Sequence, residues 1–127
     1  MANFLILTNN PSVADKYPDS IRFCDITVSG IFTAARDAVH AGARLISHPL
    51  AGSLKPNESP YKSIVLSTPQ AGLDFDSLQL IEGAIAVLKK LPDKNRVYGE
   101  QVLDDFRVID LDLMNSAMMA LPAEYHT

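Results

Sequence analysis

Four short apolar segments occur within the first 67 residues, and their spacing most constrains the fold. The first, residues 3–8, carries no charge, which is typical of a strand buried on both faces of a sheet. Further strands are predicted at residues 21–25, 43–47 and 63–67. The amphipathic segment 28–39 lies between the second and third strands and is long enough for a helical crossover between parallel strands. We therefore predict one three-layer α-β-α domain, residues 1–127, with a small, mostly parallel sheet.

The remaining segments have the start and stop signals of helices. Asn10 and Pro11 suit the N-cap and first position of a short helix, and Asp74 or Asp76 suits the cap of a helix that ends near Lys90. Residues 99–121 are predicted to form one helix, although a strand at 106–109 followed by a helix remains an alternative. The apolar face predicted for the single helix consists of Val102, Phe106, Ile109, Leu113, Ala117 and Ala120.

Composition excludes several classes of function. The net charge is −4, and from Tyr98 onward six acids face one base, so no basic stripe for nucleic acid is present. No segment approaches the roughly 20 apolar residues that a membrane span needs, and the N-terminal apolar run is too short for a signal peptide. We expect a cytoplasmic protein. Cys24 is the single cysteine and is predicted to be a structural thiol rather than a catalytic one.

The long connection between the third and fourth predicted strands concentrates polar residues. It contains three prolines, which stiffen it, and several side chains suited to a ligand. Parallel strands end at one edge of a sheet, where ligands of open α/β sheets bind. That edge would also gather the residues at the ends of the first and fourth strands, including Ser67 and Thr68. The residues predicted to bind a ligand there are Asn9, Asn10, His48, Gly52, Ser53, Lys55 and Asn57.

Each of these residues also has a structural explanation. His48 is a candidate acid–base or a ligand donor, but it equally suits a loop anchor that bonds the backbone. Gly52, Ser53 and Lys55 offer a small-residue turn and a cation for an anion, or turn chemistry alone. Capping accounts for Asn10, and side-chain turn bonds account for Asn57. No Walker loop, GxGxxG motif or zinc signature occurs, so no metal is predicted and the cofactor is unknown.

Several short motifs carry a family resemblance. They are Thr8-Asn9-Asn10-Pro11, Arg36-Asp37 with His40, Gly42-Ala43-Arg44-Leu45, His48 to Asn57, and Pro60-Tyr61. Together they resemble the GrdX family, small proteins associated with the glycine, sarcosine and betaine reductase systems of anaerobic amino-acid-fermenting bacteria. The resemblance covers most of the chain. It implies a cytoplasmic accessory protein and brings no established activity or catalytic residue.

Three functions follow as expectations. The leading one is a non-redox accessory protein that binds a small anionic metabolite at the carboxyl ends of the strands. The first alternative is an enzyme acting on a phosphorylated or carboxylated metabolite, with His48 as acid–base and Lys55 holding the anion. The second is a protein-interaction module that uses the acidic last helix, with a reductase-system protein as a possible partner.

Overall fold

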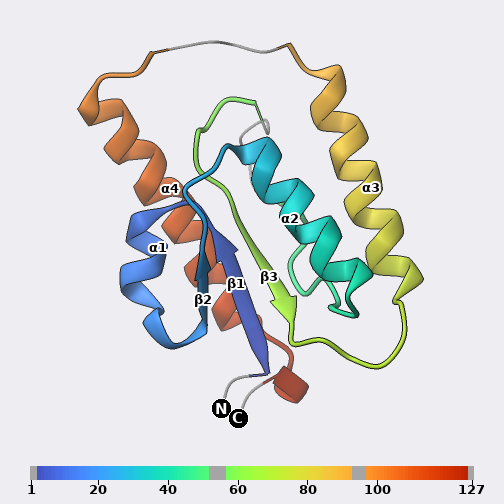
Figure 1. Ribbon diagram of the computed structural model, residues 1–127. Helices are drawn as coiled ribbons and strands as arrows, with labels where there is room; N and C mark the ends of the chain where they lie inside the picture. The colour runs from blue at the N-terminus through green and yellow to red at the C-terminus, as the bar shows by residue number, and fades with distance from the viewer. Residues whose placement is uncertain (1–2, 52–56, 93–96, 126–127) are drawn as a thin grey trace.

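The computed structural model describes residues 3–51, 57–92 and 97–125 as an α/β fold with helices on both faces of a small sheet (Figure 1). Its elements, in chain order, are β1 (Phe4–Thr8), α1 (Pro11–Lys16), the 3-10 turn Pro18–Ser20, β2 (Ile21–Phe23), α2 (Val28–His40), β3 (Ser63–Ser67), α3 (Phe75–Lys90), α4 (Glu100–Met119) and the 3-10 turn Ala123–Tyr125. The α/β class predicted from the sequence is confirmed.

The sheet has the order β2-β1-β3 and is mixed rather than largely parallel. β1 pairs parallel with β2, and Ile6 lies opposite Ile21. β1 pairs antiparallel with β3, and Thr8 lies opposite Ser63. In the sequence prediction β3 ran parallel to β1, and this is wrong. The C-terminal end of β3 therefore lies beside the start of β1, far from the end that Asn9 follows.

The strand predicted at residues 43–47 is also wrong in part, because only Leu45 forms a bridge, to Leu66. The backbone N–H groups of Ile46 and Ser47 both donate to the Val65 carbonyl oxygen, at 2.9 and 3.3 Å. The Val65 N–H in turn donates to the Ser47 side-chain oxygen at 2.9 Å instead of to a backbone carbonyl. A regular ladder cannot continue through this arrangement, although the segment still shields the outer edge of β3.

The two faces of the sheet carry separate halves of the core. Leu7 and Ile64 point toward α2 and α3, where Phe32 is among the largest fully buried side chains. Ile6 and Val65 point the other way, toward α1 and α4. This alternation follows from the period of two along a strand. All five residues of β3 are buried, as are the last three of β1, where the sequence predicts a buried strand.

Capping residues set the starts of three helices, and the sequence predicts two of these caps, Asn10 and Asp74. Asn10, Thr27 and Asp74 each accept a hydrogen bond from a backbone N–H in the first turn of the helix that follows. Gly42, just after α2, has φ of +107°, a conformation that favours glycine, and the chain turns there toward Leu45. The Thr27 cap begins α2 at a cavity that the end of α3 also lines.

Residues Glu100–Met119 form one helix, α4, so the strand-plus-helix alternative is excluded. The face predicted to be buried is wrong in part, because Ala117 packs against the core and Phe106 is half-buried but the others are exposed. Val102, Ile109 and Leu113 are 41%, 37% and 37% exposed, whereas the buried residues of α4 are Asp110 and Met114. The side of α4 that faces the core is set by a polar residue, because Asp110 points inward and accepts hydrogen bonds from Asn10 and Ser63.

Candidate functional site

Asn9, the first residue after β1, ties together two segments that are distant in sequence. Its side-chain amide donates to the carbonyl oxygens of Ile26 and Pro60, at 2.8 and 2.9 Å. Its side-chain oxygen accepts from the backbone N–H of Lys62 at 2.8 Å. The side chain is nearly buried, so these bonds are shielded from water. Asn9 thereby holds the start of α2 against the chain that enters β3.

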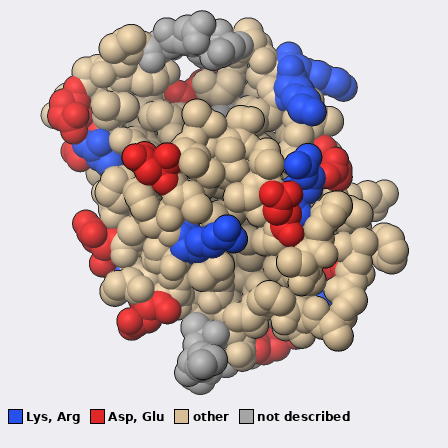
Figure 2. Space-filling view, in the orientation of Figure 1, with Lys and Arg blue, Asp and Glu red and all other residues tan. Residues whose placement is uncertain are grey.

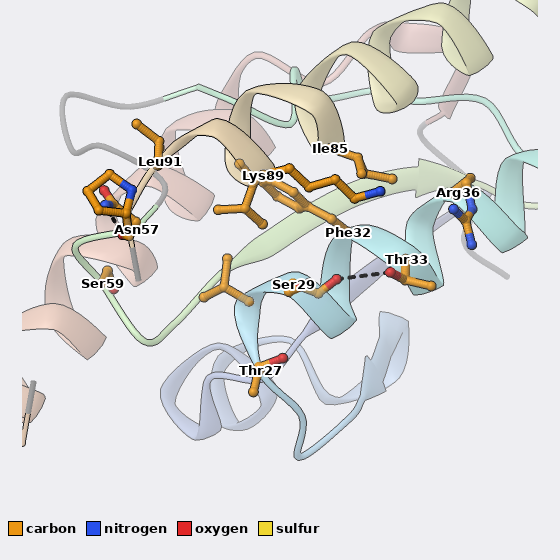
Figure 3. Close-up of a pocket in the computed structure, with 13 residues that line it drawn as sticks. Thr27, Ser29, Phe32, Thr33, Arg36, Asn57, Ser59, Ile85, Lys89 and Leu91 are labelled. Atoms are coloured by element: carbon orange, nitrogen blue, oxygen red, sulfur yellow. Dashed lines mark hydrogen bonds between the residues drawn. The ribbon is translucent and has the colours of Figure 1, made fainter. Parts of the chain in front are cut away.

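A cavity of about 430 Å³ lies between the first half of α2, the end of α3 and residues 57–59 (Figure 3). This volume is within the roughly 300–1,000 Å³ of small-molecule sites. The side chains combine an apolar floor with hydroxyl groups and two cations. The described lining residues are Thr27, Val28, Ser29, Phe32, Thr33, Arg36, Asn57, Ser59, Ile85, Leu88, Lys89, Leu91 and Pro92.

The cavity is suited to an anion. Its described lining includes Arg36 and Lys89 but no carboxylate. In Figure 3 the Lys89 side chain extends along the cavity toward the end where Arg36 lies. The opening turn of α2 also borders the cavity, and the first N–H groups of a helix lack intrahelical acceptors and favour negative charge.

Arg36 has acidic neighbours outside the cavity, but they hold it loosely. Its Nε lies 3.7 Å from Asp37 and 3.9 Å from Glu82, and all three side chains are substantially exposed. Exposed pairs at such distances contribute little to stability. Figure 2 shows basic side chains over the upper end of α3, and acidic and basic groups together over α2 beside it. A ligand carboxylate can therefore compete for the Arg36 guanidinium.

Lys62 adds a third cation close to the aromatic floor of the cavity. Its ammonium nitrogen lies 6.0 Å from the centre of the Phe32 ring. Burial lowers the pKa of Lys62 below its ordinary value, and the carboxylate of Asp110 opposes this shift only in part. At neutral pH the fold thus holds a partly desolvated positive charge, which is unfavourable for stability.

Replacing Lys62 with methionine is expected to raise the free energy of unfolding by about 1 kcal/mol at pH 7, because the charge is no longer buried. The unfolded chain binds more protons than the folded one between the lowered pKa of Lys62 and its ordinary value of 10.5. Wild-type stability therefore rises with pH in that interval, and the difference between the two proteins shrinks. Urea unfolding at several pH values measures this, with Lys16→Met as the exposed control. A Lys62→Met protein less stable than wild type at pH 7 would contradict this account.

A buried polar network anchors α4 on the opposite face of the sheet. The Asp110 carboxylate accepts from the Asn10 side-chain amide at 3.0 Å and from the Ser63 hydroxyl at 2.7 Å. The Ser63 oxygen lies 2.6 Å from the Thr8 hydroxyl oxygen, which in turn accepts from the Asn10 backbone N–H. Asn10 is fully buried, and its side chain is committed to Asp110, to the Arg107 carbonyl and to the cap of α1.

The structure places the described members of the predicted ligand site in different surroundings. His48 is exposed and lies outside the cavity lining, and its Nδ1 accepts from the Leu50 backbone N–H at 3.1 Å. Gly52, Ser53 and Lys55 lie outside the described residues. Asn57 lines the cavity; its amide nitrogen donates to the Pro92 carbonyl at 2.8 Å.

Sequence reasoning did not identify Arg36, Lys89 or Phe32 as site residues. In sequence, Arg36 has the local pattern of a solvated helix face, and Lys89 that of a cation complementing the dipole at the end of a helix. One signal points to the start of α2: Thr27 follows β2 by only a few residues, so the helix begins at the carboxyl edge of the parallel pair β1–β2. Nothing in the sequence alone indicates that the end of α3 lies across from it.

Other site classes find no support in the described part of the chain. Its His, Cys, Asp and Glu side chains form no group of three that could hold a metal ion. Among the same residues, no helix is both long and apolar enough to cross a membrane. Cys24 is partly buried and packs against the core below α2.

Comparison with known proteins gives one match. The family model described as GrdX-like protein matches residues 5–119, nearly the whole chain. No curated protein and no solved structure matches. The matched range includes β1 from its second residue, the connection that carries His48, the cavity between α2 and α3, and all of α4. The chain therefore belongs to the GrdX-like protein family.

Proposed function

We propose that this protein is a cytoplasmic, non-redox accessory protein of glycine, sarcosine or betaine reduction, and that it binds a small anionic metabolite in the cavity between α2 and α3. Membership of the GrdX-like family supports the accessory role. A single cysteine and no Cys-x-x-Cys pair support a role outside electron transfer.

The observation that carries the binding proposal is the composition of the cavity wall. Arg36 and Lys89 supply positive charge, and no carboxylate opposes them within the described lining. The Ser29 hydroxyl lies in the opening turn of α2 and adds a neutral donor, whereas the Thr33 hydroxyl already donates to the Ser29 carbonyl oxygen at 3.1 Å. Charge-assisted hydrogen bonds from the two cations are roughly twice as strong as neutral ones. Phe32 and its apolar neighbours suit the carbon skeleton of a metabolite, so an organic anion fits better than a bare inorganic ion.

Replacing Lys89 with alanine is expected to weaken anion binding about five- to thirtyfold, the equivalent of roughly 1–2 kcal/mol for a hydrogen bond to a charged group. Thermal stability should change little, because Lys89 is exposed on the surface of α3. Calorimetric titration with small carboxylate and phosphate metabolites measures both proteins.

Lys90→Ala is the matched control, because this neighbouring lysine does not line the cavity. Equal affinities for wild type, Lys89→Ala and Lys90→Ala would refute the site. The enzyme alternative is tested in the same experiment: turnover of a bound metabolite that is lost in His48→Ala would favour it over binding alone.

A further inference from the structure

A row of apolar side chains remains uncovered on α4. Val102, Ile109 and Leu113, here called the α4 stripe, are 41%, 37% and 37% exposed. Their spacings of seven and four residues place them on one side of the helix. The stripe spans about 17 Å at the rise of an α-helix, or about three turns of a partner helix. It lies on the helix layer opposite the α2–α3 cavity, so it is independent of the proposed anion site (Figure 1).

The rotation of α4 about its own axis is fixed, and this keeps the stripe out of the core of its own chain. Asp110 is held inward by Asn10 and Ser63. One turn earlier, the Arg107 guanidinium donates to the Tyr61 hydroxyl at 2.9 Å and to Glu100 at 2.6 Å. Rotating α4 to bury Ile109 would break both sets of contacts. The stripe is therefore exposed because of how α4 is anchored. Asp110 occupies the inward-facing position that an apolar residue would normally take.

The charges beside the stripe indicate the chemistry of its partner. Asp105 and Asp112 are exposed on its solvent side. The basic residue of α4, Arg107, is already paired with Glu100 and lies 3.5 Å from Asp104. A second copy placed against the stripe would bring two sets of aspartates together, which is unfavourable. An apolar surface flanked by acids instead fits apolar anchors at helical spacing flanked by Lys or Arg.

We propose that the α4 stripe docks a basic amphipathic helix of a partner protein. Apolar anchors of that helix would cover Val102, Ile109 and Leu113, and its cations would lie against Asp105 and Asp112. Such a surface allows the protein to bind a partner and a small anion at once, since the two sites occupy opposite helix layers (Figure 1).

The test uses the full chain and two fluorescently labelled synthetic helical peptides. Both have leucines at the same positions, and the other positions are lysine in one and glutamate in the other. Fluorescence anisotropy should show binding of the lysine peptide and at least tenfold weaker binding of the glutamate peptide. The double variant Ile109→Ser/Leu113→Ser should bind the lysine peptide at least tenfold more weakly than wild type.

The matched control lies on α3, where Leu80 and Val87 are 42% and 41% exposed. Leu80→Ser/Val87→Ser should bind the lysine peptide as wild type does, and circular dichroism melts establish that both double variants fold. Equal binding by both double variants would overturn the proposal, because the peptide would then be held by charge alone. Absence of binding to wild type would overturn it too. So would a wild-type dimer in analytical ultracentrifugation that Ile109→Ser/Leu113→Ser converts to a monomer, since a second copy would be the occupant.

Discussion

Replacing Asp110 with alanine is expected to lower the free energy of unfolding by about 3 kcal/mol, or roughly 10 °C in Tm. The substitution leaves the donors of Asn10 and Ser63 without their acceptor in a buried site. It also removes the contact that fixes the rotation of α4. The loss of the buried carboxylate itself is favourable and is already included in this figure.

Asp112→Ala is the matched control, because Asp112 lies on the same helix and is exposed. It should change stability by less than about 0.5 kcal/mol. Asp110→Asn keeps the shape and one oxygen acceptor, so its effect should lie between the two. Urea unfolding monitored by circular dichroism measures all three variants. Similar stabilities for Asp110→Ala and Asp112→Ala would show that the network does not anchor α4.

Replacing Gly42 with alanine is expected to lower the free energy of unfolding by about 3 kcal/mol, from two causes that add. The φ of +107° is strained for any residue with a Cβ atom, at about 1–2 kcal/mol. The new Cβ would also stand only 2.4 Å from the carbonyl oxygen of Gln70, whose N–H donates to the Gly42 carbonyl. Backbone on both sides must shift to relieve that contact.

Gly72 separates the two causes, because it has a positive φ of +86° but no steric contact to relieve. Among the described residues beyond its chain neighbours, no atom lies within 4 Å of the position that a Cβ would take. Gly72→Ala should therefore show the backbone strain alone, about 1 kcal/mol. Chemical unfolding of both variants provides the comparison. If Gly42→Ala were no more destabilising than Gly72→Ala, the close approach between residue 42 and Gln70 would not be a real constraint.

Local signals in the sequence predicted most helices and strands well. They predicted poorly how these elements pair and pack with one another. Asn10, Thr27 and Asp74 are caps because their short side chains reach N–H groups within the same helix turn. The direction of β3 depends instead on how residues 48–62 return to the sheet, which no local pattern encodes. The rotation of α4 was misjudged for a related reason: hydrophobic spacing assigns Asp110 to solvent, and its buried partners come from β3 and from the residue before α1.

The cavity between α2 and α3 shares only Asn57 with the described residues that the sequence predicts to bind a ligand. Asn9 was expected to contact a ligand, and its side chain instead fixes the Ile26 and Pro60 segments beside the cavity. Asn57 was included and does line the cavity. Arg36 and Lys89 were not predicted as site residues, because the local sequence pattern of each is that of an ordinary cation on a helix surface. Only the packing of α2 on α3 makes them neighbours of one cavity.

Mapping an anion on the protein by two-dimensional ¹⁵N–¹H NMR tests the central claim most directly. The protein is titrated with phosphate and with a small carboxylate such as propionate, at constant ionic strength. We expect saturable shifts at the backbone amides of the first half of α2 and of Ile85–Leu91, with little change at Ala51 or in α4. Shifts centred on His48 and Leu50, or no saturable shift at the start of α2, would contradict the assignment of the anion site to the cavity between α2 and α3.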